Sequence, residues 1–197
     1  TKRRWLPELR VINQYHDDPR YITALADSVR QHQATHGSGE LLLFSFHGTP
    51  QRYLLDGDPY HCQCQKTARL VAEELGLTSD QYQVTFQSRF GKAQWLQPYT
   101  DKTLMALPTQ GTKHVQVICP GFSADCLETL EEIKVENKEY FIEAGGERFD
   151  YIDCLNSSDA HIQLMSDLIK QHTQGWPESV DRNNTASLAN ATSDNRP

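Results

Sequence analysis

A nearly unbroken apolar run, LLLFSF over residues 41–46, constrains the fold of this chain more than any other feature. A strand buried on both faces, as in a parallel sheet, has this composition, whereas a strand with one wet face alternates apolar and polar residues. The run is far too short to cross a bilayer, which takes about 20 residues. It therefore predicts a central strand in a parallel sheet that helices cover on both sides.

Short apolar stretches alternate with longer amphipathic ones along the rest of the chain. The pattern predicts strands over 9–15, 41–46, 83–88 and 114–119, and helices over 20–33, 59–75, 100–107, 124–144 and 159–172. Residues 149–153 are either a short strand or merely extended. Gly76 follows one of these helices and Gly145 another, as expected for helix ends. We predict an α/β fold with three α/β/α layers and a mostly parallel, Rossmann-like sheet of four to five strands.

The periodic pattern stops before the end of the chain. Residues 174–197 are polar and rich in Asn, Ser and Thr, which is typical of disorder. We therefore predict one α/β domain over 1–173 and a disordered polar tail over 174–197. Because the chain opens at Thr1 rather than at Met, we expect it to be part of a longer protein.

The charge balance and the cysteines exclude some classes of protein. Nineteen Lys and Arg against 26 Asp and Glu give a net charge of −7, which argues against nucleic acid as a partner. The cysteines are odd in number and widely spread, unlike a disulfide framework, so we expect a reduced, cytoplasmic protein. They are Cys62, Cys64, Cys119, Cys126 and Cys154. Since Cys62 and Cys64 lack the spacing of a zinc site, we interpret them as ordinary thiols.

A histidine stands at the predicted end of the first buried strand. His47 follows the run over 41–46 directly, and Gly48 and Pro50 turn the chain sharply behind it. Parallel sheets bind their ligands at the carboxyl ends of strands. An imidazole there can accept a proton near neutral pH or bind a transition metal. The alternative is a structural histidine bonded to the loop backbone.

Carboxylates and aromatic side chains follow two other strands. Glu128, Glu132 and Glu136 are four residues apart in the helix predicted over 124–144, so they share one face. Such a row is either a solvated acidic surface or a track for a divalent cation, and oxygen with imidazole donors suits Fe(II). Beyond the strand over 83–88, Phe90 and Trp95 either line a site for a flat aromatic ligand or anchor their loop on the sheet.

Three stretches occur in order along the chain: LLLFSFHGTPQRYLLDGDPYHCQ, FQSRFGKAQWLQPYTD and VICPGFSADCLETLEEI. Together they resemble protoporphyrin ferrochelatase, and more narrowly the carboxyl-terminal half of the proteobacterial type. The likeness runs from about residue 9 to about residue 171. It implies a chelatase-like fold and a lyase that inserts Fe(II) into protoporphyrin IX to make protohaem, the last step of haem biosynthesis.

The resemblance implies roles for the histidine and the acidic row. His47 matches the family's active-site histidine, a proton acceptor and metal ligand. Glu128 matches the catalytic carboxylate that faces this histidine across the porphyrin cleft and also binds metal. Glu132 and Glu136 match acidic positions that are thought to guide the metal ion inward.

Other positions match the family in part. Trp95 and Phe122 match residues that line the porphyrin pocket. Cys126 stands where some members have histidine, so its role stays open. Because no cysteine follows Cys154, the resemblance implies no carboxyl-terminal [2Fe–2S] cluster, and we expect no cofactor beyond Fe(II) as a substrate. The expected partners are Fe(II), protoporphyrin IX and the family's amino-terminal half, which this chain lacks; peripheral membrane contact is left open.

Three alternatives remain at this point. One is a cobalt or nickel tetrapyrrole chelatase on the same fold. Another is a non-catalytic metal- or porphyrin-binding module, which gains weight because half of the cleft is missing. The third is a flavodoxin-like domain with an acidic surface helix, which does not account for motifs at three adjacent strand ends.

Overall fold

A computed structural model describes residues 8–176 of the chain. Residues 14–162 form one compact unit, and residues 8–13 and 163–176 belong to a second. The sheet and the candidate site residues lie in the first unit. Most of the tail predicted over 174–197 lies outside the described residues, so the domain boundary at residue 173 stays a prediction.

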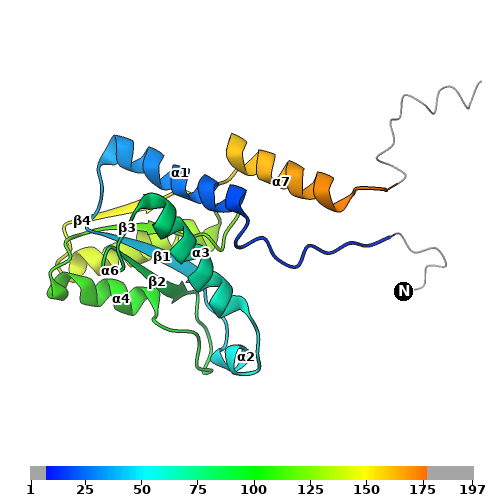
Figure 1. The fold of residues 1–197 in the computed structure, drawn as a ribbon. Helices are drawn as coiled ribbons and strands as arrows, with labels where there is room; N and C mark the ends of the chain where they lie inside the picture. The colour runs from blue at the N-terminus through cyan, green and yellow to red at the C-terminus, as the bar shows by residue number, and fades with distance from the viewer. Residues whose placement is uncertain (1–7, 177–197) are drawn as a thin grey trace, which may run out of the picture. The chain divides into compact units, whose positions relative to one another are not determined.

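A parallel sheet of four strands lies at the centre of the larger unit (Figure 1). The strands are β1 (Leu41–His47), β2 (Tyr82–Gln87), β3 (His114–Ile118) and β4 (Arg148–Ile152), in the order β2-β1-β3-β4. Phe44 of β1 pairs with Val84 of β2 and with Ile118 of β3, so β1 is an inner strand. Its apolar run is buried throughout, and the predicted α/β fold with a mostly parallel sheet is confirmed.

Helices cover both faces of this sheet (Figure 1). α1 (Pro19–His36) and α3 (Tyr60–Leu75) lie on one face, and α4 (Thr100–Ala106) and α6 (Lys138–Glu143) lie on the other. α1 begins after Asp18, whose carboxylate accepts the N–H of Arg20 at 2.9 Å and so caps the helix. α3 ends at Gly76, whose φ of 71° is in the left-handed region that favours glycine. The predicted three layers are therefore present.

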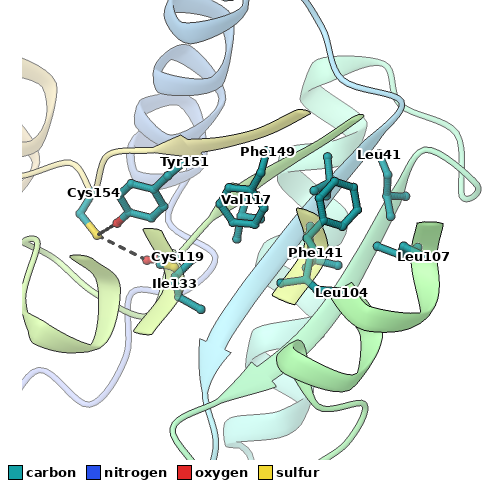
Figure 2. Packing of buried hydrophobic residues seen from close by; sticks show 12 residues of the cluster. Leu41, Leu104, Leu107, Val117, Cys119, Ile133, Phe141, Phe149, Tyr151 and Cys154 are labelled. Atoms are coloured by element: carbon teal, nitrogen blue, oxygen red, sulfur yellow. Dashed lines mark hydrogen bonds between the residues drawn. The ribbon is translucent and has the colours of Figure 1, made fainter. Parts of the chain in front are cut away.

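An apolar cluster fills the space between the sheet and the layer of α4 and α6 (Figure 2). Its members are Leu41, Leu43, Leu104, Leu107, Val115, Val117, Cys119, Ile133, Phe141, Phe149, Tyr151 and Cys154. The strand residues in it alternate in sequence because successive side chains point to opposite faces. One of its thiols is close to polar atoms, since Cys154 Sγ lies 3.4 Å from Tyr151 Oη and 3.9 Å from the main-chain oxygen of Cys119.

The strand predicted over 9–15 is wrong. The backbone of these residues has no ladder partner among the described residues, and the side chains of Leu9 and Val11 are 84% and 77% exposed. Alternating apolar residues specify a strand only where a neighbouring strand pairs with them and buries one face. The sheet among the described residues consequently has four strands, the lower end of the predicted four to five.

The helix predicted over 124–144 begins later and is not α-helical throughout. It consists of α5 (Leu127–Leu130), a π-helical segment η2 (Glu132–Asn137) and α6. Cys126 is extended (φ −147°) and is the N-cap, and its N–H donates to Thr129 Oγ1 at 2.9 Å. In η2 the N–H of Glu136 donates to Glu131 O at 2.9 Å, five residues back. A repeat of similar residues every four positions in the sequence does not distinguish a π-helical segment from an α-helix.

The remaining elements agree with the prediction or extend it. α7 (Asp159–His172) has the predicted bounds. The helix expected over 100–107 ends as α4 and continues in a 3₁₀ turn, η1 (Leu107–Gln110), around Pro108. A short helix that was not predicted, α2 (Gln51–Leu55), follows the turn after β1.

Candidate active site

His47 is the last residue of β1 and lies at the carboxyl edge of the sheet, half-buried. Its main-chain carbonyl accepts the hydroxyl of Tyr60 at 2.8 Å, which fixes the strand end to the start of α3. Its Nδ1 lies 2.6 Å from Gly48 O. Because a carbonyl oxygen only accepts, Nδ1 carries the hydrogen in this contact, and Nε2 retains a free lone pair in the neutral ring. The local backbone thus orients a proton acceptor.

Main-chain hydrogen bonds fix the turn after His47 to two other segments. The N–H of Gly48 donates to Gln87 O at 2.8 Å, and the N–H of Leu96 donates to Thr49 O at 2.9 Å. A Cβ on residue 48 would lie 2.8 Å from Gln87 O, so only glycine fits this approach. The turn is therefore part of the sheet edge.

Trp95 lies next to the histidine and is 6% exposed. Its indole N–H donates to Phe90 O at 3.0 Å, and its ring centroid is 6.4 Å from that of His47. The hydrogen bond and the burial fit the anchoring role that the sequence left open. The position of Trp95 beside His47 also fits a residue that lines a binding site, and the same side chain can have both roles.

Phe122 is the second aromatic neighbour of the histidine. It follows β3 in a turn closed by its own N–H to Cys119 O at 3.1 Å, and it packs against the apolar cluster. Its ring centroid is 6.1 Å from that of His47. Trp95 and Phe122, which are 27 positions apart in the sequence, thus come together around one imidazole.

Glu128 lies in the first turn of α5, near the same edge of the sheet. A hydrogen bond from the Cys126 thiol, its own N–H and, last, an electrostatic interaction with His47 lower the pKa of this carboxyl. The pKa of Cys126 is raised, by burial first and then by Glu128, so that residue stays a neutral thiol at pH 7. The effect of His47 is the smallest of these influences on Glu128.

Glu132 is held tightly by the end of β2. Its carboxylate accepts the N–H of Ser88 at 2.6 Å and the Ser88 hydroxyl at 2.5 Å. Ser88 has a positive φ of 62°, which aims both donors at the carboxylate. Glu132 and Glu136 line one pocket of about 220 Å³, and Glu128 is outside its lining. The acidic row is thus divided between the pair in this pocket and the carboxylate near His47.

Sequence reasoning missed the polar support beneath these carboxylates. Gln87, 3% exposed, donates from Nε2 to Glu128 O at 2.7 Å and to Glu132 Oε2 at 3.3 Å. Its Oε1 accepts the buried Ser45 hydroxyl at 2.8 Å. The available signal was a glutamine at the end of an apolar strand, because a buried amide needs partners.

Residues 8–176 contain no group of three or more His, Cys, Asp and Glu side chains that is arranged to hold a metal ion. No helix in the same range is both long and apolar enough to span a bilayer. All five cysteines are unpaired thiols, with Cys62 exposed and Cys64, Cys119 and Cys154 buried.

Comparison with known proteins agrees with the resemblance found in the sequence. Residues 1–173 match the family model described as Ferrochelatase. The chain is 63% identical to the ferrochelatase of Hydrogenovibrio crunogenus over 89% of this chain and 46% of that protein. It is 58% identical to that of Pseudoalteromonas atlantica, over 97% of this chain and 53% of that protein.

A third relative gives the same proportions. The ferrochelatase of Marinobacter nauticus is 57% identical over 94% of this chain and 52% of its own length. The chain thus spans about half the length of the curated relatives it matches. The family match covers most of its residues, and the chain belongs to the ferrochelatase family.

Proposed function

We propose that this chain supplies one half of the cleft of a ferrochelatase, the lyase that inserts Fe(II) into protoporphyrin IX to form protohaem. The observation that carries the proposal is the position of His47 at the carboxyl edge of the sheet, with its ring centroid 6.4 Å from that of Trp95 and 6.1 Å from that of Phe122. Glu128 is near enough for His47 to be among the groups that lower its pKa. The ferrochelatase relatives support the same reaction.

His47 is the proposed proton acceptor. Metal insertion requires the two pyrrole N–H protons to leave the porphyrin. Since Nδ1 is held by Gly48 O at 2.6 Å, Nε2 presents the lone pair that takes a proton. The imidazolium that forms is stabilised by the carboxylate of Glu128, and the proton then passes to solvent. Catalysis of this kind contributes about 10²–10⁴-fold to a rate.

The carboxylates are the proposed ligands for the arriving Fe(II). Oxygen and imidazole donors suit Fe(II) and bind it less tightly than thiolates do, which favours transfer over storage. Glu132 and Glu136 share a pocket, and Glu128 precedes them in the sequence and has His47 among the groups that lower its pKa. This order fits stepwise replacement of the ion's water ligands.

The other parts of the assembly are proposals of the same kind. Trp95 and Phe122 form part of the porphyrin wall, and the amino-terminal half of the enzyme covers the opposite side. The domain over 1–173 is supported by the extent of the family match. Unpaired thiols fit a reducing compartment, so we place the protein in the cytoplasm.

The test is the variant His47→Ala in the full-length protein. We expect Fe(II) insertion to fall by about 100-fold or more, because the proton acceptor is lost. The far-ultraviolet circular dichroism and the melting temperature should stay close to wild type. The matched control is His36→Ala, which removes an exposed histidine at the end of α1 and should leave turnover unchanged. Near-normal turnover of His47→Ala would refute the assignment.

Two further measurements separate the alternatives. Initial rates with Fe(II), Co(II) and Ni(II) distinguish a ferrochelatase from another tetrapyrrole chelatase. Porphyrin titration of the full-length protein, followed by an insertion assay, identifies a non-catalytic module if binding occurs without turnover.

A further inference from the structure

The loop between β3 and α5 carries Phe122 and leads directly into the turn that holds Glu128. It is fixed from outside the candidate site by the connection between β4 and α7. Asn156 in that connection has a φ of 48°, in the left-handed region. Asparagine adopts this region more readily than most residues, and here both polar ends of its side chain are used.

Asn156 and Asp125 are joined by a reciprocal pair of hydrogen bonds. The Asn156 side-chain amide donates to Asp125 Oδ2 at 2.6 Å, and the Asp125 N–H donates to Asn156 Oδ1 at 2.9 Å. The N–H of Asn156 also donates to Ser123 O at 3.0 Å. On its other side, Asn156 O lies 2.6 Å from Nδ1 of His161, which is 5% exposed. The asparagine therefore connects a buried histidine to the active-site loop.

The Asp125 carboxylate accepts hydrogen bonds from four donors of this chain. Oδ1 accepts the Tyr151 hydroxyl at 2.6 Å, the Thr129 hydroxyl at 3.1 Å and the N–H of Cys154 at 3.4 Å. Burial raises the pKa of Asp125, but the hydrogen bonds from Asn156 and the other donors outweigh it, so the pKa is lowered overall. Thr129 directly follows Glu128 in α5, so the carboxylate also fixes the first turn of that helix.

We propose that Asn156 is a positioning residue for the active site: it clamps Asp125 and thereby fixes the loop that places Phe122 and Glu128 around His47. This inference rests on the proposed function of the site. It also gives Asp125 a structural role in place of a role in the acidic row, because four donors of this chain meet its carboxylate, three at Oδ1 and one at Oδ2. Asp125 is a structural acceptor, although it is only three residues from Glu128.

The two roles for Asp125 predict opposite results for an exchange of the two side chains. In Asn156→Asp, two carboxylates face each other and the donor to Oδ2 is lost. In the double variant Asp125→Asn with Asn156→Asp, one amide and one carboxylate again face each other. The amide oxygen at position 125 can still accept from Tyr151, Thr129 and Cys154. If the role of Asp125 is to be clamped by residue 156, this exchange restores it. If Asp125 is instead a metal ligand, the exchange does not restore the carboxylate at position 125.

The experiment compares the single and the double variant in the full-length protein. For Asn156→Asp we expect kcat for Fe(II) insertion to fall by about 10- to 100-fold, as for a misplacement of catalytic groups by a fraction of an ångström to 1 Å. In the double variant kcat should recover to within about threefold of wild type, a difference clearly smaller than the loss in the single variant. Asn156→Gly keeps the left-handed backbone and should give an intermediate loss. The matched control is Ser157→Ala, an exposed neighbour, with unchanged kcat.

Amide hydrogen exchange supplies a second readout that does not depend on catalysis. Peptides over residues 120–131 should exchange faster in Asn156→Asp and return to the wild-type rate in the double variant. The proposal is overturned if Asn156→Asp exchanges and turns over as wild type, or if the double variant recovers exchange but not kcat. If the wild-type protein inserts no metal, the proposed function fails, and the exchange data still decide whether the clamp exists.

Discussion

We expect Gly48→Ala to lower both the stability of the protein and its rate of Fe(II) insertion, because residue 48 joins the proposed proton acceptor, His47, to the sheet edge. The glycine N–H donates to Gln87 O at 2.8 Å, and the glycine carbonyl faces Nδ1 of His47 at 2.6 Å. A side chain at this position therefore disturbs the hydrogen bond that closes the edge and the one that orients the imidazole.

The magnitude follows from the space around the glycine. An added Cβ would lie 2.8 Å from Gln87 O and 3.2 Å from Trp95 Cε3, where ordinary contacts begin at 3.4 Å. The loop must retreat by roughly 0.6 Å, since neither neighbour is the flexible end of a side chain. Overpacking costs about 1–3 kcal/mol and a weakened hydrogen bond about 0.5–1.5 kcal/mol, so we expect a loss of about 2–4 kcal/mol. A shift of this size at His47 should lower kcat on the order of tenfold.

The assay is urea unfolding of the full-length protein with linear extrapolation, together with initial rates of Fe(II) insertion. The matched control for stability is Gly121→Ala at the same sheet edge. Its Cβ would make only ordinary contacts, 3.5 Å from Phe46 Cδ1 and 3.7 Å from His47 N, so its cost should stay below about 1 kcal/mol. If Gly48→Ala is as stable as the control and turns over normally, the close approach described here is wrong.

Two further predictions concern buried titratable groups. Burial raises the pKa of Asp150, but hydrogen bonds from His114 and other neighbours outweigh it, so the pKa is lowered overall. The contribution of the carboxylate to the free energy of unfolding is therefore complete above the ordinary pKa of 3.8 and is lost as the pH falls through the lower pKa of the folded state. Asp150→Asn should thus cost about 1.5–3 kcal/mol at pH 7, and urea unfolding at pH 3 should show a smaller difference. Alkylation with iodoacetamide followed by mass spectrometry should modify exposed Cys62 quickly. Burial raises the pKa of Cys119 and Cys154, the latter to about 12, so both should react only after unfolding, and rapid labelling of either thiol in the folded protein would contradict the structure.

The elements that the sequence predicted well are those with a strong local pattern. The apolar run over 41–46 is the buried inner strand, and Gly76 ends α3 in the left-handed conformation. These features depend on neighbours along the chain and on burial that their composition already requires. The element that failed, the strand over 9–15, had an equally good apolar alternation but no partner strand among the described residues. Alternation alone does not provide a partner.

The sequence named the residues of the candidate site but did not indicate how they are arranged. The sequence motifs named His47, Glu128, Glu132, Glu136, Trp95 and Phe122. They gave no indication that Ser88 would occupy the carboxylate of Glu132, or that Glu132 and Glu136 would lie in a π-helical segment. The roles of these residues in a reaction stay predictions, and the variant His47→Ala tests that of the histidine.

The amino-acid sequence by itself determined the α/β alternation, the parallel sheet and the family of this protein, because hydrophobic periodicity and motifs are properties of contiguous segments. The tertiary structure alone decided which polar groups meet: Gln87 with the backbone of Glu128, and Asn156 with Asp125. The physical reason is that a hydrogen bond depends on distances of about 3 Å between atoms, and residues 31 or 41 positions apart reach such distances only after the strands and helices have packed.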